Sequence, residues 1–251
     1  MLGLKGLIVG VANEHSIAWG CAKVLHESGA ELAITYQNEK AKAYVQPLVE
    51  IISSPIFMPL DVTNETQFEQ LFETIKSTWG RLDFIIHSIA FAPKADLHGR
   101  VVDSSREGFM IAMDISCHSL TRLAKAAESL MTNGGAIITM SYYGAEKVVS
   151  NYNLMGPVKA ALEASVRYLA VELGSKNIRV NALSPGPVKT RAASGLTDFD
   201  LLMEKAANEA PLNQLVTIEA IGEATAFLIS NKARFITGQT IYVDGGYNLK
   251  G

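Results

Sequence analysis

A tyrosine and a lysine in one short stretch have the side chains and the spacing for proton chemistry. Tyr152 and Lys159 are seven residues apart, in a segment that begins at Ser141 and also holds Tyr142 and Tyr143. On an α-helix this spacing is nearly two turns, so both side chains project from one face, roughly 10 Å apart along the axis. A lysine ammonium near a phenol lowers the pKa of the phenol and favours proton donation near neutral pH. The spacing alone is close to what chance gives, so the surrounding elements must decide whether the pair is a site.

Apolar segments alternate with helix-like segments along the whole chain. Seven short apolar runs have the length of strands: residues 5–9, 30–36, 55–60, 82–87, 136–140, 178–183 and 239–243. They are continuously apolar, which is typical of a parallel sheet covered by helices on both faces. No internal repeat, low-complexity tract or linker interrupts the pattern. The sequence therefore predicts an α/β, Rossmann-like, doubly wound seven-stranded parallel sheet, forming a single domain over residues 1–251.

Two prolines constrain the helices between these strands. Helix-like patterns cover residues 17–28, 38–52, 63–79, 107–130, 153–173 and 217–230. Pro47 is expected to kink the second helix or end it early, because proline lacks an N–H and clashes with the preceding turn. Pro157 is harmless only within about the first turn of a helix. The helix that carries Lys159 should therefore begin near Asn153 or later.

Composition and charge exclude several classes of protein. The 251 residues are 48% hydrophobic and 19% charged, which is ordinary for a globular enzyme, and the net charge of −3 argues against nucleic-acid binding. No apolar run approaches the ~20 residues of a membrane span, and the N-terminus lacks a signal-peptide pattern. A cytoplasmic protein without a membrane partner is expected. Cys21 and Cys117 have no metal-ligand spacing, so we expect buried thiols and no metal.

The loop after the first strand has features of a phosphate-binding turn. Gly10 permits a tight turn, and Ser16 can cap a helix that begins at Ile17. The exposed N–H groups at that helix start can bind a pyrophosphate, because a helix N-terminus carries partial positive charge. Since the spacing is not the G-x-G-x-x-G fingerprint, a purely structural turn is an alternative.

The ends of the second and third strands bear on the choice of nucleotide. Gln37 stands where many NAD-binding folds carry an acidic residue for the adenosine ribose, and its amide can still bond a hydroxyl. No arginine cluster follows to hold a 2′-phosphate, although Lys40 is near, which favours NADH over NADPH. Asp61, followed by Val62, can either bond the adenine amino group or cap the next helix.

Four groups of residues, each at the end of a predicted strand, together resemble a known family. The four motifs are Gly10-x5-Ser16-Ile17-Ala18-x-Gly20, the run from His87 to Pro93, Tyr142 with Tyr152-Asn153-x-Met155-Gly156-x2-Lys159, and the segment from Arg179 through Pro187. With these motifs the sequence resembles, from Gly6 to Gly246, bacterial enoyl-acyl-carrier-protein reductases, the NADH-dependent branch of the short-chain dehydrogenase/reductase superfamily.

The resemblance assigns roles to the Tyr–Lys stretch. Reduction of a trans-2-enoyl thioester forms an enolate at the thioester oxygen, and a phenol beside that oxygen can stabilise it. By resemblance the donor is Tyr152, while Lys159 holds the nicotinamide ribose hydroxyls, and Tyr142 shapes the substrate pocket or assists the donor. His87 precedes this machinery at a strand end and is expected to be a packed histidine rather than a base.

The resemblance implies further contacts from other strand ends. The turn of Ser88, Ile89 and Ala90 is expected to run under the cofactor, and Val188 and Thr190 to contact its carboxamide and pyrophosphate. Side chains suited to an acyl chain are Phe91, Met155, Phe199, Leu202 and Met203, with plain core packing as the alternative for each.

The resemblance also implies partners. The expected substrate is an enoyl thioester carried on acyl carrier protein, the expected assembly is a homotetramer, and a mobile substrate-binding lid is expected at residues 190–210. Residues 197–200 of that lid are Thr-Asp-Phe-Asp, where relatives often carry basic residues for an acidic carrier protein. Lys189, Arg191 and Lys205 are the alternative docking residues.

Two other functions compete with the reductase hypothesis. A dehydrogenase that interconverts a carbonyl and an alcohol would use Tyr-x3-Lys, a spacing that Tyr143 and Lys147 match, with Ser141 as the substrate-binding serine. Tyr143 lies only three residues past the fifth strand, however, whereas Tyr152 is eleven beyond Ser141 and fits the helical position of that motif better. The third hypothesis is a non-catalytic NAD(H)-binding scaffold, against which Tyr152 and Lys159 both argue.

Overall fold

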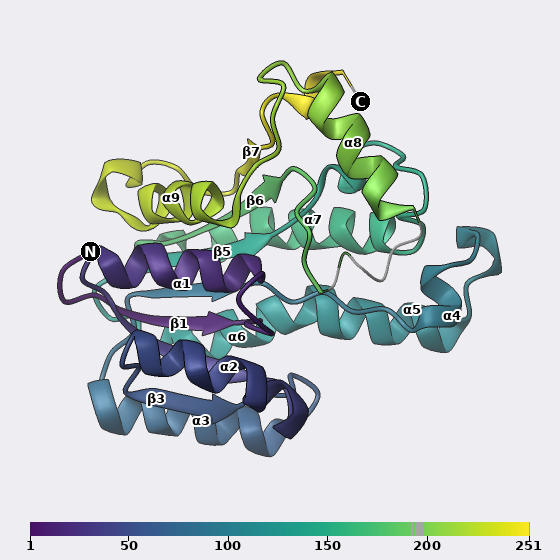
Figure 1. Cartoon of the computed structure of the whole chain (residues 1–251). Helices are drawn as coiled ribbons and strands as arrows, with labels where there is room; N and C mark the ends of the chain where they lie inside the picture. Colours follow the sequence, from purple (N-terminus) through teal and green to yellow (C-terminus); the bar gives the residue numbers. More distant parts are fainter. Residues whose placement is uncertain (192, 194–197, 251) are drawn as a thin grey trace.

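A seven-stranded sheet in the order β3-β2-β1-β4-β5-β6-β7 forms the centre of the molecule (Figure 1). The computed structural model describes residues 1–191, 193 and 198–250. All six strand pairings are parallel. The predicted doubly wound parallel sheet is therefore confirmed. The strands are β1 (Lys5–Val9), β2 (Glu31–Tyr36), β3 (Ile56–Pro59), β4 (Phe84–His87), β5 (Gly135–Met140), β6 (Ile178–Pro185) and β7 (Thr240–Val243).

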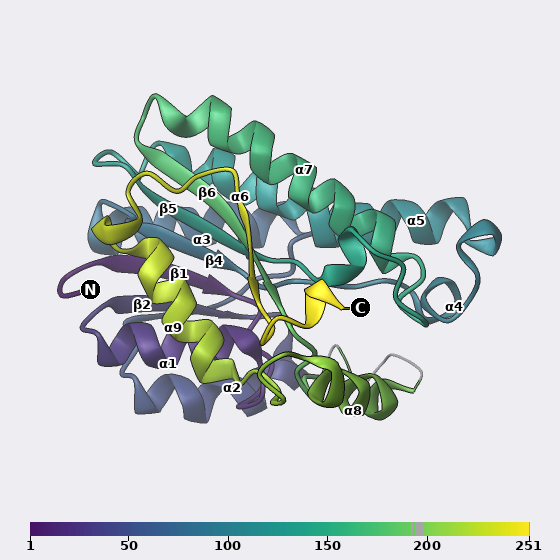
Figure 2. The ribbon, with the colours of Figure 1, turned by 90° about the horizontal axis from the view of Figure 1, so that it is seen from above.

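Helices cover both faces of the sheet because successive apolar residues of each strand point to opposite sides. Ile8 packs with α1 (Ile17–Glu27), α2 (Glu39–Ile51) and α9 (Ile218–Ile229) on one face. Leu7 packs with the opposite layer, which consists of α3 (Glu65–Trp79), α6 (Ser119–Glu128) and α7 (Met155–Gly174). Figure 2 shows the two layers on either side of the strands. This double burial explains why the strands are apolar without alternation.

The predicted helix over residues 107–130 is divided in the structure. It consists of α5 (Arg106–Met113), a π-helical segment (Asp114–His118) and α6. The π-helical segment carries Ser116, which bonds the neighbouring segment after β4. Ser116 Oγ accepts a hydrogen bond from Phe91 N at 2.8 Å and donates one to Phe91 O at 2.9 Å. A π-helical segment at this place is consistent with the tendency of such bulges to occur beside functional sites.

The carboxyl ends of the parallel strands meet at one edge of the sheet. The short α4 (Lys94–Leu97) and α5 extend beyond this edge, and α8 (Phe199–Glu209) lies above it (Figures 1 and 2). In open parallel sheets, ligands bind beyond this edge. In the described part of the chain, no helix is both long enough and apolar enough to cross a membrane.

The two prolines behave differently from each other. Pro157 is the third residue of α7, so it falls in the first turn as predicted. Pro47 lies inside α2, which continues to Ile51, so the expectation of an early end was wrong. Burial of Val45, Leu48 and Val49 against the sheet holds this helix together despite the missing N–H of Pro47.

Replacing Pro47 by alanine should stabilise the fold, because it restores an N–H to the interior of a helix. We expect a gain of up to about 3 kcal/mol, and each kcal/mol corresponds to a rise of about 2–4 °C in the thermal midpoint for a chain of this size. Pro157→Ala is the matched control and should leave the midpoint unchanged, because an N–H in the first turn of a helix has no intrahelical acceptor to bond. Thermal unfolding at one fixed protein concentration measures both; an equal rise in the two variants contradicts the prediction.

Candidate active site

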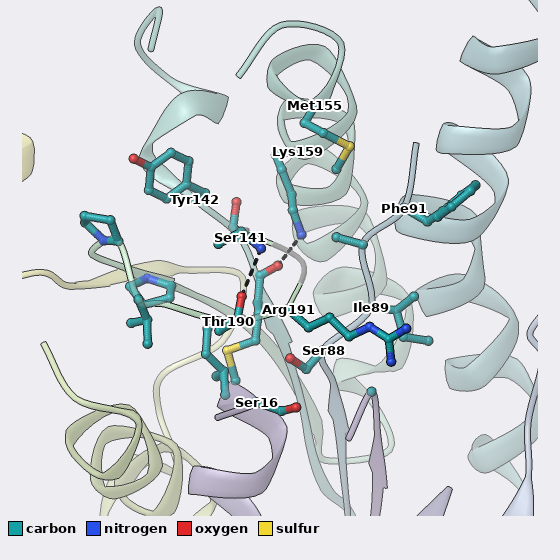
Figure 3. A pocket seen from close by; sticks show the side chains of 18 of the residues that line it. Ser16, Ser88, Ile89, Phe91, Ser141, Tyr142, Met155, Lys159, Thr190 and Arg191 are labelled. Atoms are coloured by element: carbon teal, nitrogen blue, oxygen red, sulfur yellow. Dashed lines mark hydrogen bonds between the residues drawn. The ribbon is translucent and has the colours of Figure 1, made fainter. Parts of the chain in front are cut away.

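A pocket with a volume of about 310 Å³ opens at the carboxyl edge of the sheet. It is lined by the loops after β1, β4, β5 and β6 together with the first turns of α7 and the start of α8 (Figure 3). Most of the predicted site residues line it: Gly10, Ser16, Ile17, Ser88, Ile89, Ala90, Phe91, Tyr142, Tyr152, Met155, Lys159, Val188, Thr190 and Phe199. Segments that are far apart in the sequence thus meet around one cavity.

Tyr152 lies in the turn just before α7 and is 9% exposed. Its ring packs against Tyr142, with 4.8 Å between the ring centroids. The Tyr152 ring also lies against Gly144: a Cβ added to Gly144 would be 2.4 Å from a carbon of this ring. Burial raises the pKa of Tyr152, and Tyr142 and Glu163 raise it further. The expectation that Lys159 lowers this pKa was therefore wrong: desolvation of the phenolate dominates.

Lys159 is 4% exposed and comes from the second turn of α7. Its Nζ donates a hydrogen bond to Met140 O, at the end of β5, with a length of 2.6 Å. Burial lowers the pKa of the ammonium to about 8, although Cys117 and Glu163 act in the opposite direction. The side chain is thus a cation held in the floor of the pocket, and it can be deprotonated at moderately alkaline pH.

Tyr142 contributes its ring to the pocket but not its hydroxyl. In Figure 3 the hydroxyl points to the side away from Lys159. The oxygen is enclosed and has no hydrogen-bond partner in the described part of the chain. Burial raises its pKa, and Tyr247, Tyr143 and Asp244 add to the effect. The expected assistance to the proton donor does not fit this orientation, whereas the expected shaping of the pocket does.

The competing Tyr–Lys pair does not reach the pocket. Tyr143 is buried and packs edge-on against Tyr242 and Tyr247, at centroid distances of 6.5 and 6.0 Å. Lys147 is exposed. Neither residue belongs to the pocket lining in the described ranges. The Tyr-x3-Lys spacing is therefore a coincidence of sequence, since the two side chains face different surroundings.

His87 is fully buried at the end of β4, as predicted for a packed histidine. Its Nδ1 lies 2.7 Å from Thr139 Oγ1, and its Nε2 lies 2.8 Å from Ser119 Oγ. Burial lowers its pKa to about 3, with a further lowering by Lys159. The imidazole is neutral at physiological pH and has partners at both nitrogens, so it joins β4 to β5 and α6.

The loop after β1 presents backbone N–H groups to the pocket. Gly10 has a φ of 110°, and a Cβ there would lie 2.0 Å from Ser88 O, so only glycine fits. Ser16 is the N-cap residue of α1, but its side chain does not cap the helix. Its Oγ instead accepts hydrogen bonds from Ala12 N and Asn13 N, at 3.0 and 3.1 Å. The expected capping was wrong, and the first N–H groups of α1 remain available to a phosphate.

Five predicted site residues lie outside the pocket lining. Gln37 is exposed after β2, and Leu202 and Met203 are half-buried on α8. Asp61 Oδ1 accepts hydrogen bonds from Thr63 N and Oγ1, at 2.9 and 2.7 Å, and Val62 is buried in the core. Gln37 and Asp61 follow the neighbouring strands β2 and β3 at the carboxyl edge of the sheet. Their contacts with an adenosine group stay predictions.

The pocket also contains residues that the sequence did not assign to the reductase site. Arg191 was considered only as a docking residue for a carrier protein, yet its side chain lies in the pocket beside Ser88 and Ile89 (Figure 3). Ser141 and Met140 line the same wall as Lys159. A signal was available for these two, because they directly precede Tyr142 at a strand end. Nothing local could have indicated the position of Arg191.

One part of the expected lid can be described. Within residues 190–210, residues 192 and 194–197 lie outside the described structure. Phe199 at the start of α8 lines the pocket. Lys189 Nζ is 3.1 Å from Asp200 Oδ1, and Asn151 Nδ2 is 3.4 Å from Asp198 Oδ2. These contacts tie the start of α8 to the loops beside it.

A parallel sheet with a glycine turn after β1 and a buried Tyr–Lys pair after β5 is typical of the short-chain dehydrogenase/reductase class. The sequence model of the enoyl-(acyl carrier protein) reductase family matches residues 10–248. The enoyl-acyl-carrier-protein reductase (NADH) of Rickettsia felis is 50% identical over 249 residues, which cover 99% of this chain and 96% of that protein. The enoyl-acyl-carrier-protein reductase (NADH) 1 of Rhizobium meliloti is 47% identical over 251 residues, which cover 100% of this chain and 92% of that protein.

Solved structures agree with these comparisons. The Anaplasma phagocytophilum reductase in complex with NAD has a TM-score of 0.96 and 49% identity, covering 100% of this chain and 96% of that one. The NADH reductase of Aquifex aeolicus has a TM-score of 0.96 and 48% identity, covering 100% and 98%. The chain therefore belongs to the enoyl-acyl-carrier-protein reductase family.

Gly144→Ala should displace the Tyr152 ring, because the added methyl group would lie 2.4 Å from a ring carbon. We expect at least a tenfold loss of kcat, because Tyr152 is the predicted hydrogen-bond donor and its ring would be misplaced. Gly174→Ala is the matched control, since a Cβ there meets no atom within 4 Å. Steady-state rates and thermal midpoints should be measured together; wild-type kcat in Gly144→Ala contradicts the prediction.

Proposed function

We propose that this enoyl-acyl-carrier-protein reductase works through Tyr152 as hydrogen-bond donor to the thioester oxygen and Lys159 as the anchor of the nicotinamide ribose. The observation that carries the proposal is the pair's shared position in one pocket, both side chains being almost fully buried. The raised pKa of Tyr152 supports it, because the phenol stays protonated and can donate at neutral pH. Desolvation strengthens such a hydrogen bond to a developing oxyanion.

The residues present suit a dinucleotide. The N–H groups at the start of α1 have no side-chain cap and suit a pyrophosphate, and the close approach of Gly10 to Ser88 leaves no room for a side chain there. Bound NADH supplies the hydride that reduces the trans-2-enoyl thioester in fatty-acid biosynthesis. The Lys159 ammonium has further N–H bonds beyond the one to Met140 O, and these can reach ribose hydroxyls.

An acyl chain suits the apolar wall of the pocket. Phe91, Met155 and Phe199 line it, and Phe91 is 47% exposed at its mouth. With the thioester oxygen at Tyr152, an extended chain would run along this wall toward the start of α8, where Phe199 would contact it. The proposal includes delivery of the substrate on acyl carrier protein, a homotetrameric assembly and a cytoplasmic location, as the family resemblance implies.

Tyr152→Phe should abolish most turnover while leaving NADH binding unchanged. Removing a single donor to an oxyanion costs about 10²-fold in kcat, and the phenyl ring keeps the packing against Tyr142 and Gly144. Tyr143→Phe is the control, because Tyr143 lies outside the pocket. Rates with a short 2-enoyl thioester and fluorescence titration of NADH separate the two effects. Wild-type kcat in Tyr152→Phe excludes the assigned role.

Lys159→Met should weaken NADH binding and remove its pH dependence. The free ammonium has a pKa of about 8, lowered by burial, so the wild-type affinity is full below that pH and falls as the pH rises through it. Above this pH the NADH affinity of the wild-type protein should fall by up to about tenfold per pH unit. The exposed Lys147→Met is the control. NADH titrations from pH 6.5 to 9.5 test this; a flat wild-type profile contradicts it.

A further inference from the structure

A carboxylate one turn beyond Lys159 has no part in the function described so far. Glu163 is half-buried on α7, and its Oε1 accepts a hydrogen bond from Ser141 Oγ at 2.5 Å. Lys159 and Glu163 are four residues apart, so they share one face of the helix. Met140 and Ser141, the residues they hold, are consecutive at the end of β5. Two side chains of α7 therefore fasten the same strand end.

The bond to Glu163 fixes the segment that leads to the proton donor. Ser141 is 4% exposed, and its N–H donates to Leu183 O at 2.7 Å, so its backbone is still paired with β6. Tyr142 follows directly, and its ring supports Tyr152 at 4.8 Å between centroids. Holding the Ser141 side chain as well as its backbone restricts the direction in which Tyr142 leaves the sheet.

The charge of Glu163 also acts on the catalytic groups. It favours the protonated form of Lys159 and of Tyr152. It also raises the pKa of Tyr242 on β7. The hydroxyl of Tyr242 lies 2.5 Å from Glu146 Oε2. The charge-bearing partner of Lys159 on its own helix is thus the carboxylate of Glu163, four residues away.

Two titratable groups face Lys159 from other elements. His87 on β4 has a pKa lowered to about 3 and is neutral when Lys159 titrates. Cys117 in the π-helical segment also favours the ammonium, and its Sγ is 3.5 Å from Ser165 Oγ. Glu163 shares a helix with Lys159, whereas Cys117 belongs to the π-helical segment, so separate substitutions of the two residues tell their effects on Lys159 apart.

We propose that Glu163 is a positioning residue of the reductase: it fixes the end of β5 through Ser141 and keeps Lys159 charged for the cofactor ribose. This inference rests on the proposed role of Lys159. It predicts two separable contributions of Glu163. Its hydrogen bond with Ser141 fixes the position of the β5 end, and its charge favours the ammonium form of Lys159.

Two substitutions separate these contributions. Glu163→Gln keeps an oxygen that can accept from Ser141 but removes the charge, so the pH at which NADH affinity falls should drop by about one unit. Ser141→Ala keeps the charge and removes the bond, so this midpoint should not drop, while kcat should fall about fivefold. Glu163→Asp, which retains charge on a shorter side chain, should follow Ser141→Ala. A purely structural role would alter thermal stability without moving the midpoint.

NADH titrations from pH 6.5 to 9.5 on the full chain, with rates on a 2-enoyl thioester, measure these effects. Cys117→Ser is the control for the thiol and should keep the wild-type midpoint. The inference is overturned if the pH midpoint of NADH affinity is unchanged in Glu163→Gln, or if this midpoint drops in Cys117→Ser alone. Either result leaves the proposed function intact. A wild-type profile in Lys159→Met overturns the role of Lys159 itself, and the inference falls with it.

Discussion

The hydrogen bond from the Lys159 ammonium to the carbonyl oxygen of Met140 joins α7 to the end of β5 in the floor of the pocket. It can form only because β5 ends where α7 crosses the carboxyl edge of the sheet. It uses one of three ammonium hydrogens, satisfies a strand-end carbonyl and leaves the rest of the charge facing the cavity. The glycine turn after β1 and the turn after β4 line the same cavity from the other side. Displacing this lysine would therefore disturb both the cofactor end and the donor end of the site.

Burial acts on the two proposed catalytic groups in opposite directions for one physical reason. Removing water disfavours whichever form of a group is charged, so the phenol of Tyr152 is held protonated and the ammonium of Lys159 is made easier to deprotonate. The first effect suits a hydrogen-bond donor. The second reduces the charge of a residue whose proposed role is to bind ribose, and the carboxylate of Glu163 counters it. The proposed role of Glu163 follows from this conflict.

Several polar side chains near the pocket hold the structure together and are not available for the reaction. His87 has hydrogen-bond partners at both ring nitrogens, and Ser116 bonds both backbone groups of Phe91, so these residues hold strand ends in place. Tyr142 turns its hydroxyl away from Lys159 and offers a ring face to Tyr152. The number of side chains that can exchange protons in the cavity is therefore smaller than the number of polar residues around it.

The sequence by itself determined the order of the elements, the parallel sheet and the strand ends that meet at the pocket. Continuous apolar runs identify strands buried on both faces, and the position of Tyr152 relative to Ser141 was enough to prefer it over Tyr143. The tertiary structure alone decided that Ser16 bonds its own loop, that α2 continues through Pro47, that Arg191 enters the pocket and that Glu163 meets Ser141. These outcomes depend on partners brought together by folding and on the exclusion of water, neither of which is encoded in local spacing.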